Sequence, residues 1–416
     1  MRKAVLLLSL LASTASRSQT IPDPRPFANS ITAEDLKKHL YIVASKEFEG
    51  RETGTEGQRK AAAYIQNHFQ SLSLLPGNKD SYQLYYPLFQ DSLVQAGIEI
   101  DGQVFHINED FSVNMPANHT ATLYGDGIVF AGYGISDAAR DDYKGLDVKG
   151  KIVLVLNGQP KTYPSDCIVR FEKNITTGHS SDVLGLIEGT DLKDQYLVIS
   201  AHYDHLGKRD SVIYYGADDD GSGTVSVLEL AEAFAKAKAA GKGPRRSILF
   251  LANSGEEKGL WGSEYFSDHP TIPLDKTTAD LNIDMIGRID PNRKKGDSTN
   301  YVYVVGDDKL SSQLKPISET QNKTYTRLEL DYKFNDPADP ERIYYRSDHY
   351  NFARKGVPII FYFDGIHKDY HRPTDTPDKI NYDIMEKRAR LVFYTAWDMA
   401  NRDEMLKRDL PLPKEE

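Results

Sequence analysis

Runs of apolar residues recur along the second half of the chain, each followed by polar or helical sequence. The clearest are YLVISAH (residues 196–202), SILFLAN (247–253), DLNIDMIG (280–287) and VPIIFYF (357–363). Strands this uniformly apolar occur in sheets that helices cover on both faces. An amphipathic helix pattern lies between the first two, at residues 222–240. We therefore expect an α/β fold with a mixed, mostly parallel central sheet flanked by helices.

The first part of the chain has two helical patterns and then changes character. Residues 30–45 and 56–72 repeat apolar positions at helical spacing, and Thr32 is placed to cap the first helix. Short alternating segments punctuated by glycine and aspartate follow, which is typical of strands and tight turns. We expect a β-rich insertion at residues 86–185, between the two parts of the main domain at residues 27–85 and 186–405.

The N-terminal residues 1–19 have the pattern of a secretory signal peptide. A basic start precedes an apolar run from Ala4 to Ala12 and a stretch of small residues. That run is too short for a membrane anchor in the mature protein. Cys167 is the only cysteine, so neither an internal disulfide nor a lipidated cysteine after the signal is expected. These features predict an exported protein, either periplasmic or extracellular, that its core or bound metals must stabilise.

The net charge of the chain restricts its partners. At −10, the chain would be repelled by nucleic acid and by anionic membranes, and neither is expected as a partner. The same charge is compatible with an enzyme that binds cations. The sequence does not indicate an oligomeric state.

Side chains able to bind a metal or act on a substrate follow the predicted strands repeatedly. They are His202, Asp204 and His205, the triplet Asp218, Asp219 and Asp220, the pair Glu256 and Glu257, then Asp284, Tyr370 and His371. In open α/β sheets, ligands bind at the carboxyl ends of the strands. We expect these side chains to converge at one edge of the sheet.

Most of these residues have a structural explanation when taken alone. A histidine after a strand is more often a hydrogen-bonded structural residue, and Ser254 followed by two acids is a routine helix cap. The aspartate triplet can also end a strand and cap the next helix. Asp284 is different, because an unpaired carboxylate buried in an apolar strand costs several kcal/mol and requires a counter-charge.

Taken together, two histidines and three carboxylates suit a pair of zinc ions. Zinc prefers imidazole and carboxylate ligands. A two-metal site needs one bridging carboxylate, and a further carboxylate outside the ligand set to take a proton from water. Two adjacent glutamates can divide these tasks, one binding metal and the other acting as the base.

With these residues the chain resembles the M28 family of zinc metallopeptidases, whose co-catalytic aminopeptidases use two zinc ions. The resemblance covers roughly Phe48 to Lys379, interrupted by the insertion. The matching motifs are SAHYDHLG, GADDDGSG, NSGEEKGLWGSEYF, NIDMIG, SDHYNF and DYHRPTDT. Their order and spacing are far more specific than any one of them, and the main domain is accordingly interpreted as a zinc peptidase domain.

The resemblance implies two Zn²⁺ ions per chain and a role for each ligand. His202 and Asp284 correspond to ligands of the first zinc, and Glu257 and His371 to ligands of the second. Asp219 corresponds to the carboxylate that bridges both, and a cis peptide is implied after it.

The resemblance also implies three catalytic roles. Glu256 corresponds to the general base, which afterwards protonates the leaving amine. Asp204 corresponds to the residue that orients the first zinc-binding histidine. Tyr370 resembles a tyrosine that stabilises the oxyanion in some members.

For other residues near these motifs we expect roles outside the ligand set. We expect strand register to turn His205 away from the metals, into a supporting or substrate-facing position. Asp348 and His349 are expected to line the substrate pocket. Asp220 is expected to serve the N-terminus of the next helix, and Asp218 occupies a position where relatives can carry a neutral residue.

The function implied is that of a secreted aminopeptidase that hydrolyses N-terminal residues from peptides through a zinc-bridging hydroxide. A glutaminyl cyclase, which uses a single zinc, and a carboxypeptidase on the same fold remain alternatives. A non-catalytic binding domain is disfavoured, because every ligand and base position is filled. Part of the insertion, VFAGYGISDAARDDYKGLDVKGKIVLVL, is similar to a protease-associated domain.

Overall fold

The computed structural model describes residues 21–412, except 108, 111–120, 126–127, 132, 150, 156–160, 164–166 and 337–338. The predicted signal peptide lies outside the described residues. The chain divides into two compact units, one formed by Met1–Tyr86 with His179–Glu416 and the other by Pro87–Gly178.

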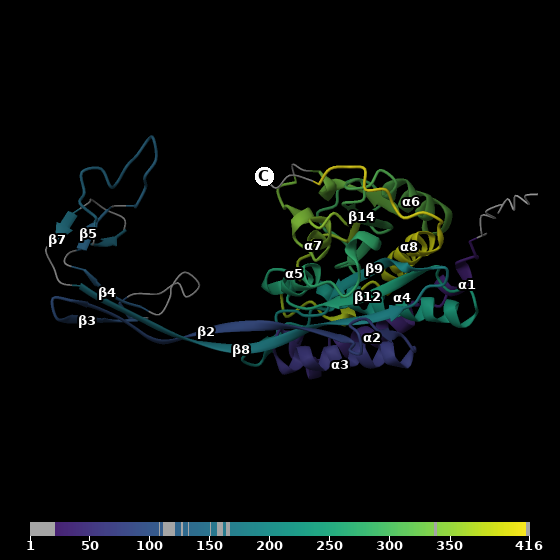
Figure 1. Ribbon diagram of the computed structural model, residues 1–416, viewed down its shortest axis with the longest axis horizontal. Helices are drawn as coiled ribbons and strands as arrows, with labels where there is room; N and C mark the ends of the chain where they lie inside the picture. The colour runs from purple at the N-terminus through teal and green to yellow at the C-terminus, as the bar shows by residue number, and fades with distance from the viewer. Residues whose placement is uncertain are drawn as a thin grey trace, which may run out of the picture. The chain divides into compact units, whose positions relative to one another are not determined.

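The first unit is built on a mixed, mostly parallel sheet (Figure 1). Its strands are β8 (Cys167–Ile187), β9 (Leu192–His202), β12 (Arg246–Asn253), β13 (Thr277–Ile283), β14 (Tyr301–Val305), β15 (Glu329–Asp331) and β16 (Ile359–Phe363). They are ordered β15-β14-β16-β13-β9-β12-β8. Neighbours from β12 through β16 run parallel, whereas β14 is antiparallel to β16, and β8 to β12. The predicted sheet is confirmed.

Helices cover both faces of this sheet. They are α1 (Arg25–Ala28), α2 (Ala33–Val43), α3 (Glu56–Ser71), α4 (Gly223–Ala239), α5 (Trp261–Asp268), α6 (Leu314–Gln321), α7 (His349–Ala353) and α8 (Tyr382–Asn401). Alternate residues of β9 point to opposite faces. Leu197 and Ile199 belong to the core cluster that contains residues of α2, α3, α4 and α8, while Val198 belongs to the cluster that contains residues of α5 and α7.

The helix starts follow the sequence closely. Thr32 caps α2 by accepting a hydrogen bond from the Asp35 N–H, and Thr55 caps α3 by accepting one from the Gln58 N–H. Both threonines satisfy N–H groups that have no partner within the helix. The predicted cap at Thr32 is confirmed.

Short elements connect the main ones. They are the strands β1 (Leu75–Pro76), β10 (Lys208–Arg209) and β11 (Val212–Ile213), the 3₁₀ turns η1 (Lys46–Arg51), η4 (Glu256–Lys258), η5 (Leu274–Lys276), η7 (Lys333–Asn335), η8 (Ile343–Tyr345) and η9 (Pro377–Lys379), and the wider turns η3 (Ala217–Ser222) and η6 (Asn322–Thr326).

The second unit is composed of strands and turns. Its strands are β3 (Gln103–His106), β4 (Ala121–Gly125), β5 (Ile128–Phe130), β6 (Ile152–Leu154) and β7 (Lys161–Tyr163), together with parts of β2 (Gln83–Ile100) and β8. Strand β5 lies between β6 and β7 in a separate three-stranded sheet. The similarity of the insertion to a protease-associated domain stays a prediction. Among the described residues, no helix combines the length and apolar character needed to cross a membrane.

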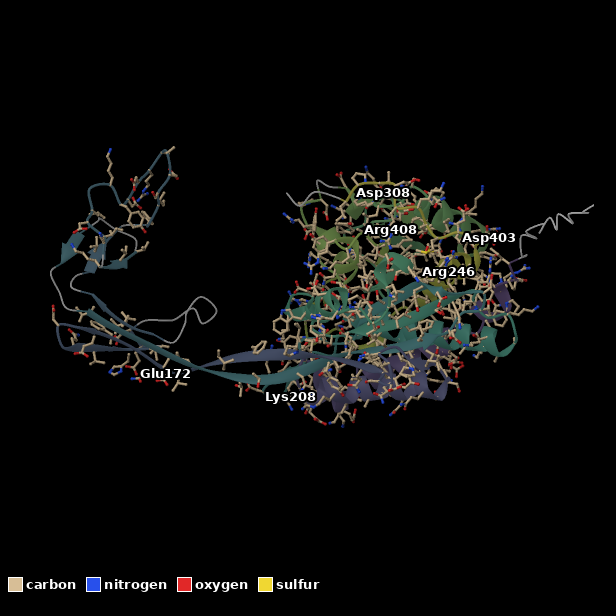
Figure 2. The ribbon with its side chains drawn as sticks, viewed as in Figure 1. Glu172, Lys208, Arg246, Asp308, Asp403 and Arg408 are labelled. Atoms are coloured by element: carbon tan, nitrogen blue, oxygen red, sulfur yellow. The ribbon has the colours of Figure 1, made fainter. Side chains whose placement is uncertain are left out.

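A buried arginine attaches the last helix to the sheet. Arg246 lies at the start of β12 (Figure 2), and its side chain is fully buried. Its guanidinium donates hydrogen bonds to the carbonyls of Met399, Arg402 and Asp403 at the end of α8. Carbonyls at a helix C-terminus have no partner within the helix, so this one side chain satisfies several of them. The contact fixes α8 against the sheet.

Asp307, which follows β14, carries a prediction about stability. Its side chain is fully buried, neither carboxylate oxygen has a hydrogen-bond partner within the described part of the chain, and burial raises its pKa to about 7. The folded state therefore keeps a proton that the unfolded chain loses near pH 4. Stability from this group is present at low pH and declines as the pH rises towards 7, by at most about 4 kcal/mol.

Replacing Asp307 by asparagine removes this decline. We expect D307N to raise the free energy of unfolding by about 2 kcal/mol at pH 8 and by much less at pH 5, measured by urea denaturation. The neighbouring D308N is the control, because Asp308 is half-exposed and pairs with Lys309. Parallel pH profiles for D307N and the unmodified chain would contradict the prediction.

Candidate metal centre

The predicted site residues converge at the carboxyl ends of the parallel strands. His202 is the last residue of β9, where it pairs in register with Asn253 at the end of β12. Glu256 and Glu257 open η4 just after β12, and Asp284 directly follows β13. Asp219 lies in η3, between β9 and α4. The parallel register thus brings together residues that are far apart in the sequence.

One group of side chains surrounds the His202 ring. Its Nε2 atom lies 3.4 Å from Asp219 Oδ1, 3.7 Å from Asp284 Oδ1 and 3.9 Å from Glu256 Oε2. Ligands about 2.0–2.1 Å from a tetrahedral zinc ion are separated by about 3.3 Å. The separations from Asp219 and Asp284 are therefore close to those that one shared ion requires.

A second group lies on the other side of Asp219. His371 Nε2 is 3.0 Å from Asp219 Oδ2 and 3.1 Å from Glu257 Oε2. Asp219 therefore turns one carboxylate oxygen to each group, which is the arrangement a bridging ligand needs. His371 has a left-handed backbone, with a φ of 55°, as does Met285 beside Asp284, with a φ of 60°. Such strained conformations concentrate at functional sites.

Unpartnered buried atoms show that these residues fit a cation. His202 Nε2, Asp219 Oδ2 and Glu257 Oε1 are buried without a hydrogen bond among the described residues. Buried polar atoms without a partner are rare, because each costs about 1–3 kcal/mol. Imidazole and carboxylate are the donor types that zinc prefers. One zinc ion in each group would provide a partner for all three atoms.

The electrostatics also favour positive charge at this place. Burial alone would lower the pKa of His202, but the carboxylates of Glu256 and Asp284 outweigh it and raise this pKa well above the ordinary value. The pKa of His371 is lowered by burial and raised more strongly by Asp219 and Glu257, to about 10. The carboxylates thus attract protons when no metal is bound.

Asp204 contacts His202 at the end of β9 and Glu256 just after β12. Its backbone carbonyl lies 3.2 Å from His202 Nδ1, and its carboxylate oxygen Oδ1 lies 3.6 Å from the same atom. The carboxylate also accepts hydrogen bonds from the Glu256 N–H and the Thr53 hydroxyl. Its position therefore suits the orienting role, exercised on Glu256 as well as on His202.

The three aspartates of η3 have separate contacts. Asp220 accepts hydrogen bonds from the N–H groups of His202, Gly223 and Met285, and Gly223 is the first residue of α4. Asp218 accepts one from the Gly287 N–H. The Asp219–Asp220 peptide is cis, as the resemblance implied. Only Asp219 faces both groups of side chains.

Two residues support this turn: Asp375, which the sequence places among the possible metal-binding residues after the last strand without a specific role, and His367, which received no prediction. Asp375 accepts hydrogen bonds from the N–H groups of Asp218 and Asp219. His367 Nε2 lies 3.1 Å from Asp218 Oδ2. Both belong to the loop after β16 that carries His371. The available signal for His367 was its position four residues after β16, and for Asp375 it was the DYHRPTDT motif.

His205 differs from the expectation. Its Nδ1 atom lies 2.7 Å from Glu257 Oε1 and 3.8 Å from Asp219 Oδ2, so the ring points towards the second group. The alternation of side chains applies only within a strand, and β9 ends at His202. Strand register therefore does not decide the direction of a residue three positions later.

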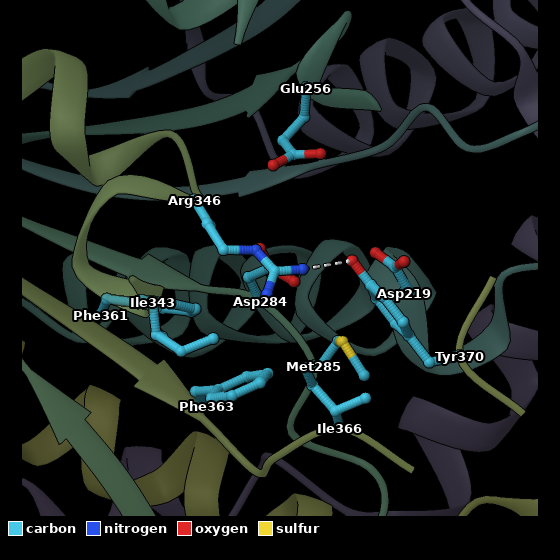
Figure 3. A pocket seen from close by; sticks show the side chains of 10 residues that line it. All are labelled: Asp219, Glu256, Asp284, Met285, Ile343, Arg346, Phe361, Phe363, Ile366 and Tyr370. Carbon is cyan, nitrogen blue, oxygen red and sulfur yellow. Dashed lines mark hydrogen bonds between the residues drawn. The ribbon is translucent and has the colours of Figure 1, made fainter. Parts of the chain in front are cut away.

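A pocket opens beside these groups (Figure 3). Asp219, Glu256 and Asp284 form its polar end, and its apolar wall is made by Met285, Ile343, Phe361, Phe363 and Ile366. Arg346 and Tyr370 complete the lining, and Arg346 Nη2 donates a hydrogen bond to the Tyr370 hydroxyl at 3.2 Å. An apolar pocket with a few convergent polar groups is typical of a substrate site.

Asp348 and His349 are not among the residues that line this pocket. Both are fully buried, and the His349 ring stacks on Phe361, which does line it. The expectation that they face the substrate is corrected, because α7 begins at His349 and packs these residues into the core.

Curated relatives match part of this chain. A probable leucine aminopeptidase of Arthroderma otae is 30% identical over 50% of this chain and 55% of its own length. A probable zinc metalloprotease of Pyrenophora teres f. teres is 32% identical over 42% of this chain and 35% of its own length. The chain thus covers about half, or less, of each relative.

Solved structures share the fold at low sequence identity. An aminopeptidase from Aneurinibacillus sp. strain AM-1 has a TM-score of 0.60 at 16% identity, covering 95% of this chain and all of that one. A glutaminyl cyclase of Porphyromonas gingivalis has a TM-score of 0.50 at 14% identity, and the match covers 88% of this chain and 99% of that one. The model of peptidase family M28 matches residues 182–396, more than half of the chain, which therefore belongs to peptidase family M28.

Proposed function

We propose that this chain is an exported dizinc exopeptidase that removes N-terminal residues from peptides. The observation that carries the proposal is the position of Asp219, whose two carboxylate oxygens face two separate groups of metal-binding side chains. A site for a single ion does not need a carboxylate placed in this way. Family membership supports a zinc-dependent peptidase.

Each ion would have its own residues. His202, Asp219 and Asp284 would hold the first, and Asp219, Glu257 and His371 the second. Bound zinc supplies Lewis acidity, which polarises a carbonyl oxygen and lowers the pKa of water.

Glu256 is the residue that we propose moves a proton. It lines the pocket, and the hydrogen bond from its backbone N–H to Asp204 holds it at the edge of the first group. Burial raises the pKa of its carboxyl well above the ordinary value, and bound cations would lower it again. A carboxyl whose pKa lies close to the working pH can take a proton from water and return it to a leaving amine. We assign Glu256 as the general base and then the general acid.

Tyr370 would donate a hydrogen bond to a substrate oxygen. Burial raises the pKa of its phenol well above the ordinary value, so the hydroxyl stays protonated. Because Arg346 can only donate, it occupies the acceptor side of the phenol oxygen and leaves the phenol proton free. A donor held in this way stabilises the negative charge that develops on a carbonyl oxygen under attack.

We therefore expect Y370F to lower kcat about 100-fold with little change in KM. The measurement is steady-state hydrolysis of an aminoacyl amide by the zinc-loaded protein. Y345F is the matched control, because Tyr345 packs against neighbouring tyrosines and does not line the pocket. Equal activity of Y370F and the unmodified chain would remove Tyr370 from the mechanism.

The apolar wall of the pocket predicts the side chain that the substrate presents. Phe361, Phe363 and the neighbouring aliphatic residues would gain free energy from a large apolar group and little from a small one. We expect kcat/KM to be at least about 10-fold higher for N-terminal leucine than for N-terminal alanine, measured on matched dipeptides. A preference for alanine or for acidic residues would contradict this use of the pocket.

The direction of cleavage is tested with a peptide panel. Free-amine, N-blocked and C-blocked peptides are incubated with the zinc-loaded protein, with and without a chelator. Hydrolysis that requires a free N-terminus and stops with chelator supports the proposal. A requirement for a free C-terminus indicates a carboxypeptidase, and pyroglutamate formed by a protein with one zinc indicates a cyclase. Absence of any reaction indicates a binding domain.

A further inference from the structure

We propose that His205 is a sixth protein ligand of the metal centre, binding the second ion together with Asp219, Glu257 and His371. The inference rests on the proposed dizinc function. It changes the second site from three protein ligands to four.

The two histidines flank the same pair of carboxylates. His205 Nδ1 lies 2.7 Å from Glu257 Oε1, while His371 Nε2 lies 3.1 Å from Glu257 Oε2. Both rings also approach Asp219 Oδ2, at 3.8 Å and 3.0 Å. Potential ligand atoms of His205, Asp219 and Glu257 all lie within 4.8 Å of one another. An ion bound by Asp219 and Glu257 would therefore lie between the two rings.

No hydrogen bond accounts for the His205 ring. The side chain is fully buried, and neither ring nitrogen has a hydrogen-bond partner among the described residues. The 2.7 Å contact of Nδ1 with Glu257 Oε1 is an ion pair only when the ring is protonated, and neither atom has a hydrogen-bond partner among the described residues. Burying an imidazole without partners is costly. A shared cation would remove the cost for both residues.

The backbone around the ring leaves space for it at this position. Gly216 has a φ of 53°, and a Cβ added there would lie 2.4 Å from His205 Cγ. The loops on both sides are joined by buried Arg51, whose guanidinium donates hydrogen bonds to the carbonyls of Tyr203 and Gly216. The His205 ring is therefore held in place before any ion binds.

A fourth protein ligand makes the two sites unequal. Zinc sites with four protein ligands are closed and structural in character, whereas catalytic sites keep one position open. The second ion would be held more tightly and the first, with His202, Asp219 and Asp284, would retain the open position. We expect a chelator to remove the two ions in two separate steps.

The test is made on the zinc-loaded full chain and its variants H205N and H205C. X-ray absorption should give about 1.5 imidazoles per zinc for the unmodified chain, because three histidines share two ions, and about 1.0 for H205N. Chelator competition should show at least a 10-fold loss of affinity at the tighter site of H205N. H269N is the control, because His269 is an exposed histidine that stacks on Tyr265 and belongs to neither group of potential ligands.

H205C separates a ligand from a hydrogen-bonding residue. A thiolate binds zinc or cobalt but cannot donate a strong hydrogen bond to Glu257, whereas asparagine can donate and is a poor ligand. Tight binding restored in H205C, with a thiolate-to-metal absorption band in the cobalt-loaded protein, supports the inference. If H205N keeps the imidazole count and affinity of the unmodified chain, His205 is not a ligand, although the dizinc function stands. An unmodified chain that binds fewer than two zinc ions overturns both.

Discussion

Replacement of Glu256 by glutamine is expected to lower kcat about 10³-fold while both metal ions stay bound. The amide has nearly the same shape as the carboxyl but cannot accept a proton from water, and general acid–base catalysis contributes about 10²–10⁴-fold. The hydrogen bond from the backbone N–H of residue 256 to Asp204 does not depend on the side chain. The local structure should therefore be preserved.

Metal content decides how this result is interpreted. Glu256 Oε2 lies 3.9 Å from His202 Nε2, close enough for the residue to be grouped with the potential metal ligands. Two zinc ions per chain in E256Q, measured by elemental analysis, identify a base, whereas loss of one ion identifies a ligand. E264Q is the matched control, because Glu264 is an exposed carboxylate paired with Arg354. Full activity in E256Q would refute the assignment.

Replacement of Asp219 by asparagine is expected to weaken binding at both metal positions. Its Oδ1 faces His202 and its Oδ2 faces His371, so one substitution removes a charged ligand from each site. An asparagine side chain offers one oxygen and no charge. We expect zinc affinity at each site to fall by more than about 100-fold. Replacing a residue that only hydrogen-bonds to a metal ligand already lowers metal affinity by about 10- to 100-fold. Hydrolysis should fall below detection.

The neighbouring aspartate provides a strict control for this experiment. Asp218 is buried in the same turn, but its contacts are the Gly287 N–H and His367. D218N should keep two zinc ions, as measured by chelator competition on the same preparation. If D219N retained both ions with unchanged affinity, Asp219 would not be the bridge and the two-ion centre would need another carboxylate.

The apolar strands and the residues directly after them could be predicted from the sequence. A run such as SILFLAN can be buried only in a sheet covered on both faces, and parallel register then aligns the strand ends. His202, Glu256, Glu257 and Asp284 lie within a few residues of these ends, so their convergence follows from local pattern. The helix starts at Thr32 and Thr55 are local for the same reason.

Other features depend on how separate loops pack. Strand register says nothing about His205, because β9 ends three residues earlier and the ring direction is set by the space at Gly216 and the loops joined by Arg51. The pocket combines Ile343 of η8, residues of β16 and Arg346, which no periodicity relates. Asp348 and His349 were expected to face this pocket and are instead buried by α7.

Local pattern was enough to predict the four apolar strands, the helices at residues 30–45, 56–72 and 222–240, and the carboxylates and histidines near the strand ends, because burial and backbone hydrogen bonding act over a few residues. The family resemblance already implied a bridging role for Asp219, whereas the direction of the His205 ring and the apolar wall of the pocket follow only from the packing of the folded chain. Those features depend on distances of a few ångströms between loops that are distant in the sequence, and only the packing of the whole domain sets such distances.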